Sequence, residues 1–126
     1  MKYTEPYKPH LHYKGYYDSS RVGARARGWR LKEARKKGRH TKKEWEEMKD
    51  FFDNTCCCCM GDSGLFHVEK DHVIPIYQGG SDALYNLQPL CARCNSSKGS
   101  NVSDWRPQLA DFLNKELPIK YQLPNG

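Results

Sequence analysis

The central part of the chain carries three motifs, which are Cys56-Cys-Cys-Cys59, Asp71-His-Val-Ile-Pro-Ile-Tyr-Gln-Gly-Gly80 and Asn86-Leu-Gln-Pro-Leu-Cys-Ala-Arg-Cys-Asn-Ser-Ser-Lys-Gly99. The first and the third each contain a Cys-x-x-Cys pair. Four thiolates in this pattern can hold one Zn²⁺ ion in a closed tetrahedral site, which is structural because it leaves no position for water. The sequence therefore predicts a structural zinc site made by four cysteines: Cys56, Cys59, Cys91 and Cys94.

The remaining two cysteines leave alternatives open. Cys57 and Cys58 do not fit the pair spacing, but either could take part in misligation or oxidation. Metal binding is favoured over disulfides because the six cysteines are clustered and Met1 to His10 lack the apolar run of a secretory signal. The hydrophobic content of 37% predicts a thin core, which a bound metal would stabilise.

The second and third motifs supply the residue types that phosphodiester hydrolysis requires. That reaction needs a base for the attacking water, and positive charge at the phosphate and the leaving oxygen. His72 is the candidate base, because a neutral imidazole can accept a proton near neutral pH. Asp71 offers a carboxylate and Asn95 an amide oxygen, which are ligands that Mg²⁺ or Mn²⁺ prefers. A surface ion pair is the plain alternative for an adjacent Asp and His.

These motifs resemble the HNH nuclease family, in the form whose third signature residue is Asn: His72, Asn86 and Asn95. The resemblance covers residues 56–99, and a weaker similarity extends back to Thr41. It implies a ββα-metal (His-Me finger) fold, in which a two-stranded hairpin and a helix surround one metal. Asp71 and His72 would lie on the hairpin and Asn95 on the helix, while Asn86 would orient the loop and the His72 ring. Many four-cysteine members of similar length come from phages, and the implied products carry a 5′-phosphate and a 3′-hydroxyl.

The proposed site makes a geometric demand on the chain. Neighbours in a regular strand point to opposite faces, so Asp71 and His72 can flank one phosphate only if the strand ends or bulges there. Pro75, just beyond them, fits an edge or irregular strand. Lys98 and Arg93 lie on the expected metal-binding helix, where they either touch phosphate or form a solvated face.

One segment carries the whole positive excess. Residues 21–43 contain eleven lysines and arginines and one acidic residue, a net charge of +10, whereas the complete chain carries +6. This is the footprint of contact with a polyanion, with weak sequence preference and strong salt dependence. The predicted nucleic-acid contacts are Arg25, Arg27, Arg30, Arg35, Lys36, Lys37 and Arg39. Trp29 either stacks on bases or anchors the segment to the core, and the second is the safer expectation.

The flanking patterns predict an α+β chain. We expect a basic helix over 21–38 with Gly38 as its C-terminal stop, and a second helix that begins with the capping box Thr41-Lys-Lys-Glu44. Short strands are expected at 65–70 and 73–77. A helix from about Ala92 and a last helix over 105–117 follow. Two apolar helix faces are expected: Trp45, Met48, Phe51 and Phe52, then Trp105, Leu109, Phe112 and Leu113.

This organisation gives three units: a basic, tyrosine-rich arm and helix over 1–40, a nuclease domain over 41–117 and a tail over 118–126. The leading hypothesis is a monomeric, intracellular endonuclease that nicks or cuts DNA without a membrane anchor. The first alternative is a non-catalytic, zinc-stapled DNA-binding module. The second is a nuclease subunit that is active only with partners, such as phage packaging proteins.

Overall fold

The computed structural model describes residues 19–61 and 67–124, so the expected arm at the N-terminus and the side chain of Arg25 lie outside its described part. No helix in this part is both long and apolar enough to cross a membrane. The elements in chain order, with 3-10 helices written η, are α2 (Ser19–Lys37), α3 (Lys42–Phe51), β1 (Val68–His72), η1 (Ile76–Gln78), η2 (Leu84–Asn86), β2 (Leu87–Cys91), α4 (Ala92–Lys98), α5 (Arg106–Phe112) and η3 (Ile119–Tyr121).

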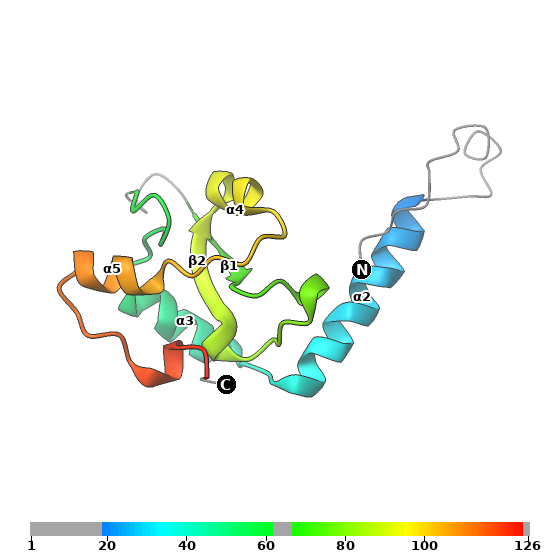
Figure 1. Cartoon of the computed structure of the whole chain (residues 1–126), viewed down its shortest axis with the longest axis horizontal. Helices are drawn as coiled ribbons and strands as arrows, with labels where there is room; N and C mark the ends of the chain where they lie inside the picture. Colours follow the sequence, from blue (N-terminus) through cyan, green and yellow to red (C-terminus); the bar gives the residue numbers. More distant parts are fainter. Residues whose placement is uncertain (1–18, 62–66, 125–126) are drawn as a thin grey trace.

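β1 and β2 pair antiparallel, with Val68 opposite Cys91 and His72 opposite Leu87 (Figure 1). The strand predicted at 73–77 is wrong, because the chain bends after His72 and enters η1 at Pro75. The second strand is the segment expected only to lead into the next helix. All five of its residues are buried, so it lacks the alternation that marks a half-exposed strand.

The helix predicted from Ala92 is confirmed as α4, which follows β2 without a connecting loop. Cys91 is the last residue of β2 and also the N-cap of α4, and its sulfur accepts a hydrogen bond from the Cys94 amide. The direct join fixes the direction of α4 relative to the sheet, so the face of α4 that carries Asn95 and Lys98 lies against β1.

The predicted capping box at the start of α3 is confirmed. The Glu44 amide donates to the Thr41 hydroxyl at 3.0 Å, and the Thr41 amide donates to the Glu44 carboxylate at 2.8 Å. Trp45 and Met48 are buried, as their spacing predicts. At the other end, Asp53 takes a left-handed φ of 55°, which closes the helix.

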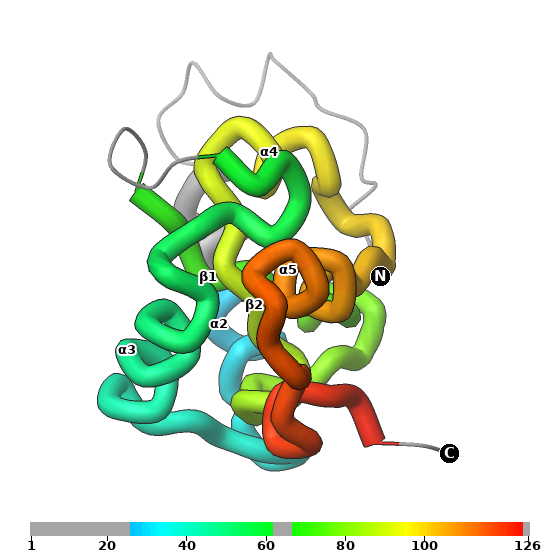
Figure 2. Tube along the Cα trace, turned by 90° about the vertical axis from the view of Figure 1, so that its left-hand side faces the viewer, coloured from blue at the N-terminus to red at the C-terminus, as the bar shows by residue number. Residues whose placement is uncertain are grey.

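The core lies between α3, β2 and α5 (Figure 2). α5 is shorter than predicted: Asn114 takes a left-handed φ of 58°, and the next amide, that of Lys115, donates back to the Ala110 carbonyl. Phe112, expected on the apolar face, is 65% exposed. Tyr121, in the stretch expected to be a tail, is instead buried, and its ring packs edge-on against Phe51.

The predicted basic helix is confirmed as α2, which extends from the body on the side of the sheet opposite α5 (Figures 1 and 2). Gly38 follows its last residue, but for a reason other than a left-handed stop. A Cβ at position 38 would lie 2.7 Å from the Ala83 Cβ, so glycine allows the close approach of the chain to the 73–86 loop. Trp29 is 63% exposed, so the expectation that it anchors α2 to the core is wrong.

Candidate metal centre and active site

Four cysteine thiols meet where β2 passes into α4. The Sγ atoms of Cys56, Cys59, Cys91 and Cys94 all lie within 4.8 Å of one another. Zn–S bonds of about 2.3 Å place the sulfurs of a tetrahedral site roughly 3.8 Å apart. The observed Sγ–Sγ distance of 4.0 Å between Cys59 and Cys91 fits that geometry. The cluster can therefore hold one zinc ion, and it would join the 56–59 turn to the β2–α4 junction.

The surroundings of the thiols separate ligands from core cysteines. Although burial alone raises the pKa of Cys56, backbone amides of Cys59, Cys91 and Cys58 donate to its sulfur and lower that pKa to about 7. This favours the thiolate, the form that binds metal. Cys57 is fully buried, and burial raises the pKa of its thiol. Cys57 and Cys58 do not belong to the four-thiol group.

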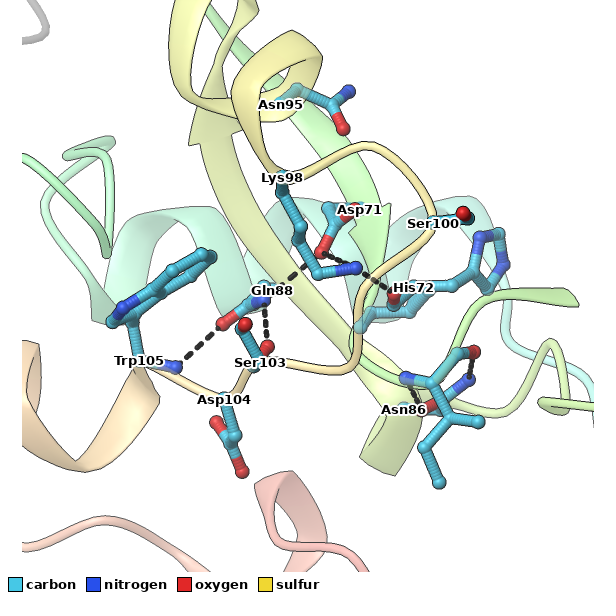
Figure 3. A network of polar contacts seen from close by, with 12 residues as sticks. Asp71, His72, Asn86, Gln88, Asn95, Lys98, Ser100, Ser103, Asp104 and Trp105 are labelled. Carbon is cyan, nitrogen blue, oxygen red and sulfur yellow. Dashed lines mark hydrogen bonds and ion pairs between the residues drawn. The ribbon is translucent and has the colours of Figure 1, made fainter. Parts of the chain in front are cut away.

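Asp71 lies in β1 and faces α4, where its carboxylate is almost fully enclosed. Its Oδ2 atom accepts a hydrogen bond from Gln88 Nε2 at 2.9 Å and lies 3.3 Å from the Lys98 ammonium (Figure 3). The side chain of Lys98 is 1% exposed, and its Nζ also donates to the His72 carbonyl at 2.9 Å. Burial raises the pKa of Asp71, whereas Gln88 and Lys98 oppose that rise. Asp71, the predicted metal ligand, thus already forms an ion pair with Lys98 of the same chain.

Asn95 shares the same side of β1 but contacts a different residue. Its Nδ2 donates to the Glu69 carboxylate at 2.9 Å. Glu69 and Asp71 are two positions apart on β1, so their side chains point to the same face of the strand. Asn95 and Lys98 are three positions apart on α4, so they lie on one side of that helix, which meets this face of β1. In the described part of the chain, the four thiols are the one close group of three or more His, Cys, Asp or Glu ligands. A hard cation at Asp71 would therefore also need the Asn95 oxygen and ligands from outside the protein.

His72 ends β1 and faces the opposite way, toward α2. Its Nε2 atom lies 2.8 Å from Asp82 Oδ1, and its side chain is 20% exposed. The ring borders a cleft of about 620 Å³, whose other walls include Arg27 and Arg30 of α2 and Tyr77 of η1. An imidazole here can exchange a proton with water in the cleft.

Asn86 is 1% exposed and holds the loop that joins the strands. Its Oδ1 accepts from the Ile74 amide at 2.9 Å, and its Nδ2 donates to the carbonyls of Ile74 at 2.9 Å and Ser81 at 2.8 Å. The backbone turns so tightly here that a Cβ on Gly80 would lie 1.8 Å from the Ile74 carbonyl oxygen. The side-chain amide of Asn86 thus fixes the loop after His72 at Ile74 and at Ser81.

The structure does not bring the four predicted site residues to one point. The register runs regularly to the end of β1, with Asp71 opposite Gln88 and His72 opposite Leu87, so the two side chains point to opposite faces (Figure 3). The strand ends at His72, which is the first of the two alternatives under which Asp71 and His72 can flank one phosphate. We name the side with Glu69, Asp71, Asn95 and Lys98 the α4 face. The side with Lys70, His72, His40 and Asp82 is the α2 face.

The part of the chain that holds this arrangement is similar to a known family. Residues 56–101 match the family model described as HNH endonuclease. This segment is therefore similar to the HNH endonuclease family. The match begins at the first cysteine of the four-thiol cluster and ends after α4, so it contains the cluster, both strands and all four predicted site residues. The cluster is compatible with a zinc-binding form of the domain. No curated protein and no solved structure matches the chain.

The predicted nucleic-acid contacts lie outside the HNH match, on and after α2. Arg27 and Arg30 border the cleft beside His72, and Arg30 lies 5.9 Å from the Tyr77 ring centroid. Arg35, Lys36 and Lys37 instead contact Asp82, Glu33 and the Gly79 carbonyl of the chain itself. Arg39 is exposed beside a second hollow that His40 and His72 also border.

Three residues with contacts at the site were not predicted to belong to it. Asp82 and His40 were not singled out, and Lys98 was expected to touch phosphate or to form a solvated face. All three have short polar contacts with site residues or their neighbours. The signal available for Asp82 was an acidic residue in a short loop between the His and Asn motifs. No pattern distinguishes Lys98 from the other cations of the chain.

Proposed function

We propose that the protein is a metal-dependent endonuclease that hydrolyses DNA phosphodiester bonds, with residues 41–117 as the nuclease domain. The observation that carries the proposal is the HNH match over a β1–β2–α4 unit in which Asp71 and His72 end the first strand and Asn95 lies on the helix. This order of elements supports a ββα-metal core. The match to the HNH endonuclease family supports hydrolysis. The charge of +10 over residues 21–43 supports a nucleic-acid substrate.

In this proposal, His72 takes the proton from the attacking water, and the cleft beside its ring admits that water. Asp71 and Asn95 hold Mg²⁺ or Mn²⁺, which would supply positive charge to the phosphate and the leaving oxygen. Asn86 keeps the loop after His72 in place through its three hydrogen bonds. The four thiols hold zinc and fix α4 against the sheet. Cations of α2 hold the DNA backbone without reading its sequence.

Supercoiled plasmid tests the proposal directly. Incubation with Mg²⁺ or Mn²⁺ at low salt should yield nicked circles, and EDTA should abolish them. His72→Ala should lower the rate about 100- to 10,000-fold, because one group supplies the base. His67→Ala is the matched control, since His67 is exposed just before β1 and should cut as the wild type does. A His72→Ala protein that nicks at the wild-type rate would contradict the assignment.

A specific observation favours a second candidate, a nuclease subunit that is idle alone and active in a larger assembly. Lys98 neutralises Asp71 in a site where both side chains are nearly enclosed, so metal binding must displace or add to that ion pair. A partner or the substrate could supply the energy, and phage packaging proteins are one such class of partner. Activity that appears only after a partner is added would support this candidate. A zinc-stapled DNA-binding module without catalysis predicts DNA binding and no nicking with any partner.

A further inference from the structure

Asp82 is a buried carboxylate that lies on the α2 face between three elements. It is 5% exposed and sits in the loop that Asn86 holds. Its Oδ1 atom lies 2.8 Å from His72 Nε2, while its Oδ2 atom lies 3.5 Å from Arg35 Nε and 3.6 Å from His40 Nδ1. One carboxylate therefore joins the end of β1 to α2 and to the α2–α3 connection.

We propose that Asp82 is a positioning residue that holds neutral His72 as the Nε2–H tautomer and so leaves Nδ1 to accept the proton from water. The inference rests on the proposed function, because it concerns the residue proposed as the base. It adds a residue that the expected His, Asn and Asp set does not contain.

The hydrogen-bond roles follow from what each group can donate. A carboxylate beside the guanidinium of Arg35, which is always charged, accepts hydrogen bonds and has none to give. A neutral imidazole has one N–H and one lone pair. The 2.8 Å contact therefore requires the proton on Nε2 of His72, and the lone pair is left on Nδ1.

The main chain of Asp82 is held as firmly as its side chain. Its carbonyl can only accept, so His40 donates from Nδ1 at 2.7 Å, and Lys70 Nζ donates to His40 Nε2 at 2.7 Å. The Asp82 amide donates to the Ala34 carbonyl of α2 at 3.3 Å. These bonds fix the carboxylate before any substrate binds. They also mean that docking of α2 contributes to the orientation of His72.

The fixed tautomer has a consequence for rate. When a buried carboxylate fixes the tautomer of a catalytic histidine, its replacement by an amide keeps the shape and allows the wrong tautomer, at a cost of up to roughly 10,000-fold in rate. Asn can turn its NH₂ toward Nε2, which moves the ring proton to Nδ1 and removes the acceptor. We expect Asp82→Asn to lower kcat about 100- to 10,000-fold with less than about a threefold change in KM for plasmid. Asp82→Glu should recover part of that loss, because it restores an acceptor-only group.

¹⁵N-histidine NMR of the zinc-loaded full chain tests the tautomer without any reaction. The protein has five histidines, and the signals absent from His72→Ala assign those of His72. At alkaline pH the wild type should show protonated Nε2 and unprotonated Nδ1, whereas Asp82→Asn should show protonated Nδ1 or a mixture. Asp111→Asn, an exposed position on α5, is the matched control and should change neither the spectrum nor the rate.

Two results would overturn the inference. One is a wild-type His72 ring that is protonated on Nδ1. This result would contradict the proposed tautomer even if Asp82→Asn fails to fold. The other is a folded Asp82→Asn protein with the wild-type rate and spectrum. If His72→Ala also retains full activity, the proposed function fails. If His72→Ala is inactive while Asp82→Asn is unaffected, only the role of Asp82 fails.

Discussion

The two faces of β1 differ in how their polar groups are arranged, although Asp71 and His72 are sequence neighbours. On the α4 face, Asp71 and Lys98 form an enclosed ion pair with side-chain exposures of 7% and 1%. On the α2 face, His72 is 20% exposed and borders a cleft. One strand therefore supplies an enclosed charged pair on one face and an open histidine beside a cleft on the other. A phosphate at the end of β1 would have to contact both the α4 face and the α2 face.

The largest effect should come from the four-thiol cluster, where we propose that Zn²⁺ binds. Cys91 and Cys94 lie at the start of α4, so loss of the ion frees the helix from the 56–59 turn. Structural zinc sites contribute roughly 10–16 kcal/mol of apparent binding energy, which is comparable to the total stability of a domain. Cys59→Ser should therefore lose stoichiometric zinc and cooperative thermal unfolding, measured by metal analysis and circular dichroism.

Cys58→Ser is the matched control, since Cys58 lies in the same turn and outside the four-thiol group. It should retain zinc and unfold cooperatively. Equal zinc loss in both variants would mean that the 56–59 run ligates in another pattern. That outcome would revive the alternative of misligation.

The next effect concerns the ion pair that closes the α4 face. Lys98→Met should lower the free energy of unfolding at neutral pH by about 3 kcal/mol, because it leaves the Asp71 carboxylate buried with Gln88 as its remaining partner. The deficit should shrink as the pH falls. Burial already raises the pKa of Asp71, and a protonated Asp71 needs no cation. Urea unfolding at several pH values measures both effects.

The double variant Asp71→Asn/Lys98→Met controls for the lost packing of Lys98, and it should recover most of the neutral-pH deficit. Added Mg²⁺ should stabilise Lys98→Met more than the wild type if a cation can replace the ammonium. A deficit that stays the same at every pH would show that the ion pair is not its cause.

A smaller change should separate the two faces. Asn86→Ala removes three hydrogen bonds and leaves buried backbone groups unpaired. It should therefore lower the free energy of unfolding by about 2–3 kcal/mol. Because the loop carries Asp82 to the α2 face, hydrogen exchange should accelerate over residues 73–86 while α4 amides stay protected. Asn101→Ala, at an exposed position, should alter neither. Equal acceleration in α4 would indicate that the two faces are not separable.

Local signals predicted α2, α3 and α4 because each helix carries its own start, stop or periodicity. The capping box at Thr41 is such a signal, and the observed hydrogen bonds satisfy it. β2 was missed because a strand buried on both faces shows no alternation. The end of α5 was placed too late because the left-handed Asn114 competes with an apolar pattern that continues to Leu117.

The four-cysteine cluster could be predicted because ligand spacing is itself a sequence pattern. The contacts of Asp71 and His72 could not be predicted. Their partners, Lys98 and Asp82, are brought to them by the tertiary packing and belong to no local motif. The partners of a buried charge depend on which elements pack together. For this reason the residue types of the site were predictable, while the division of the site between two faces was not.

The smallest effect should show which face meets DNA. Arg27 borders the cleft of the α2 face, whereas Arg93 is exposed on α4, so Arg27→Gln and Arg93→Gln form a matched pair. If the backbone of DNA lies along α2, Arg27→Gln should reduce the slope of log K against log salt by about 0.9, the value for one phosphate contact. Arg93→Gln should leave the slope unchanged, and both variants should unfold within about 0.5 kcal/mol of the wild type. Fluorescence anisotropy with labelled duplex DNA at several salt concentrations measures the slopes. A loss confined to Arg93→Gln would place DNA over α4 and leave the open cleft to a different role.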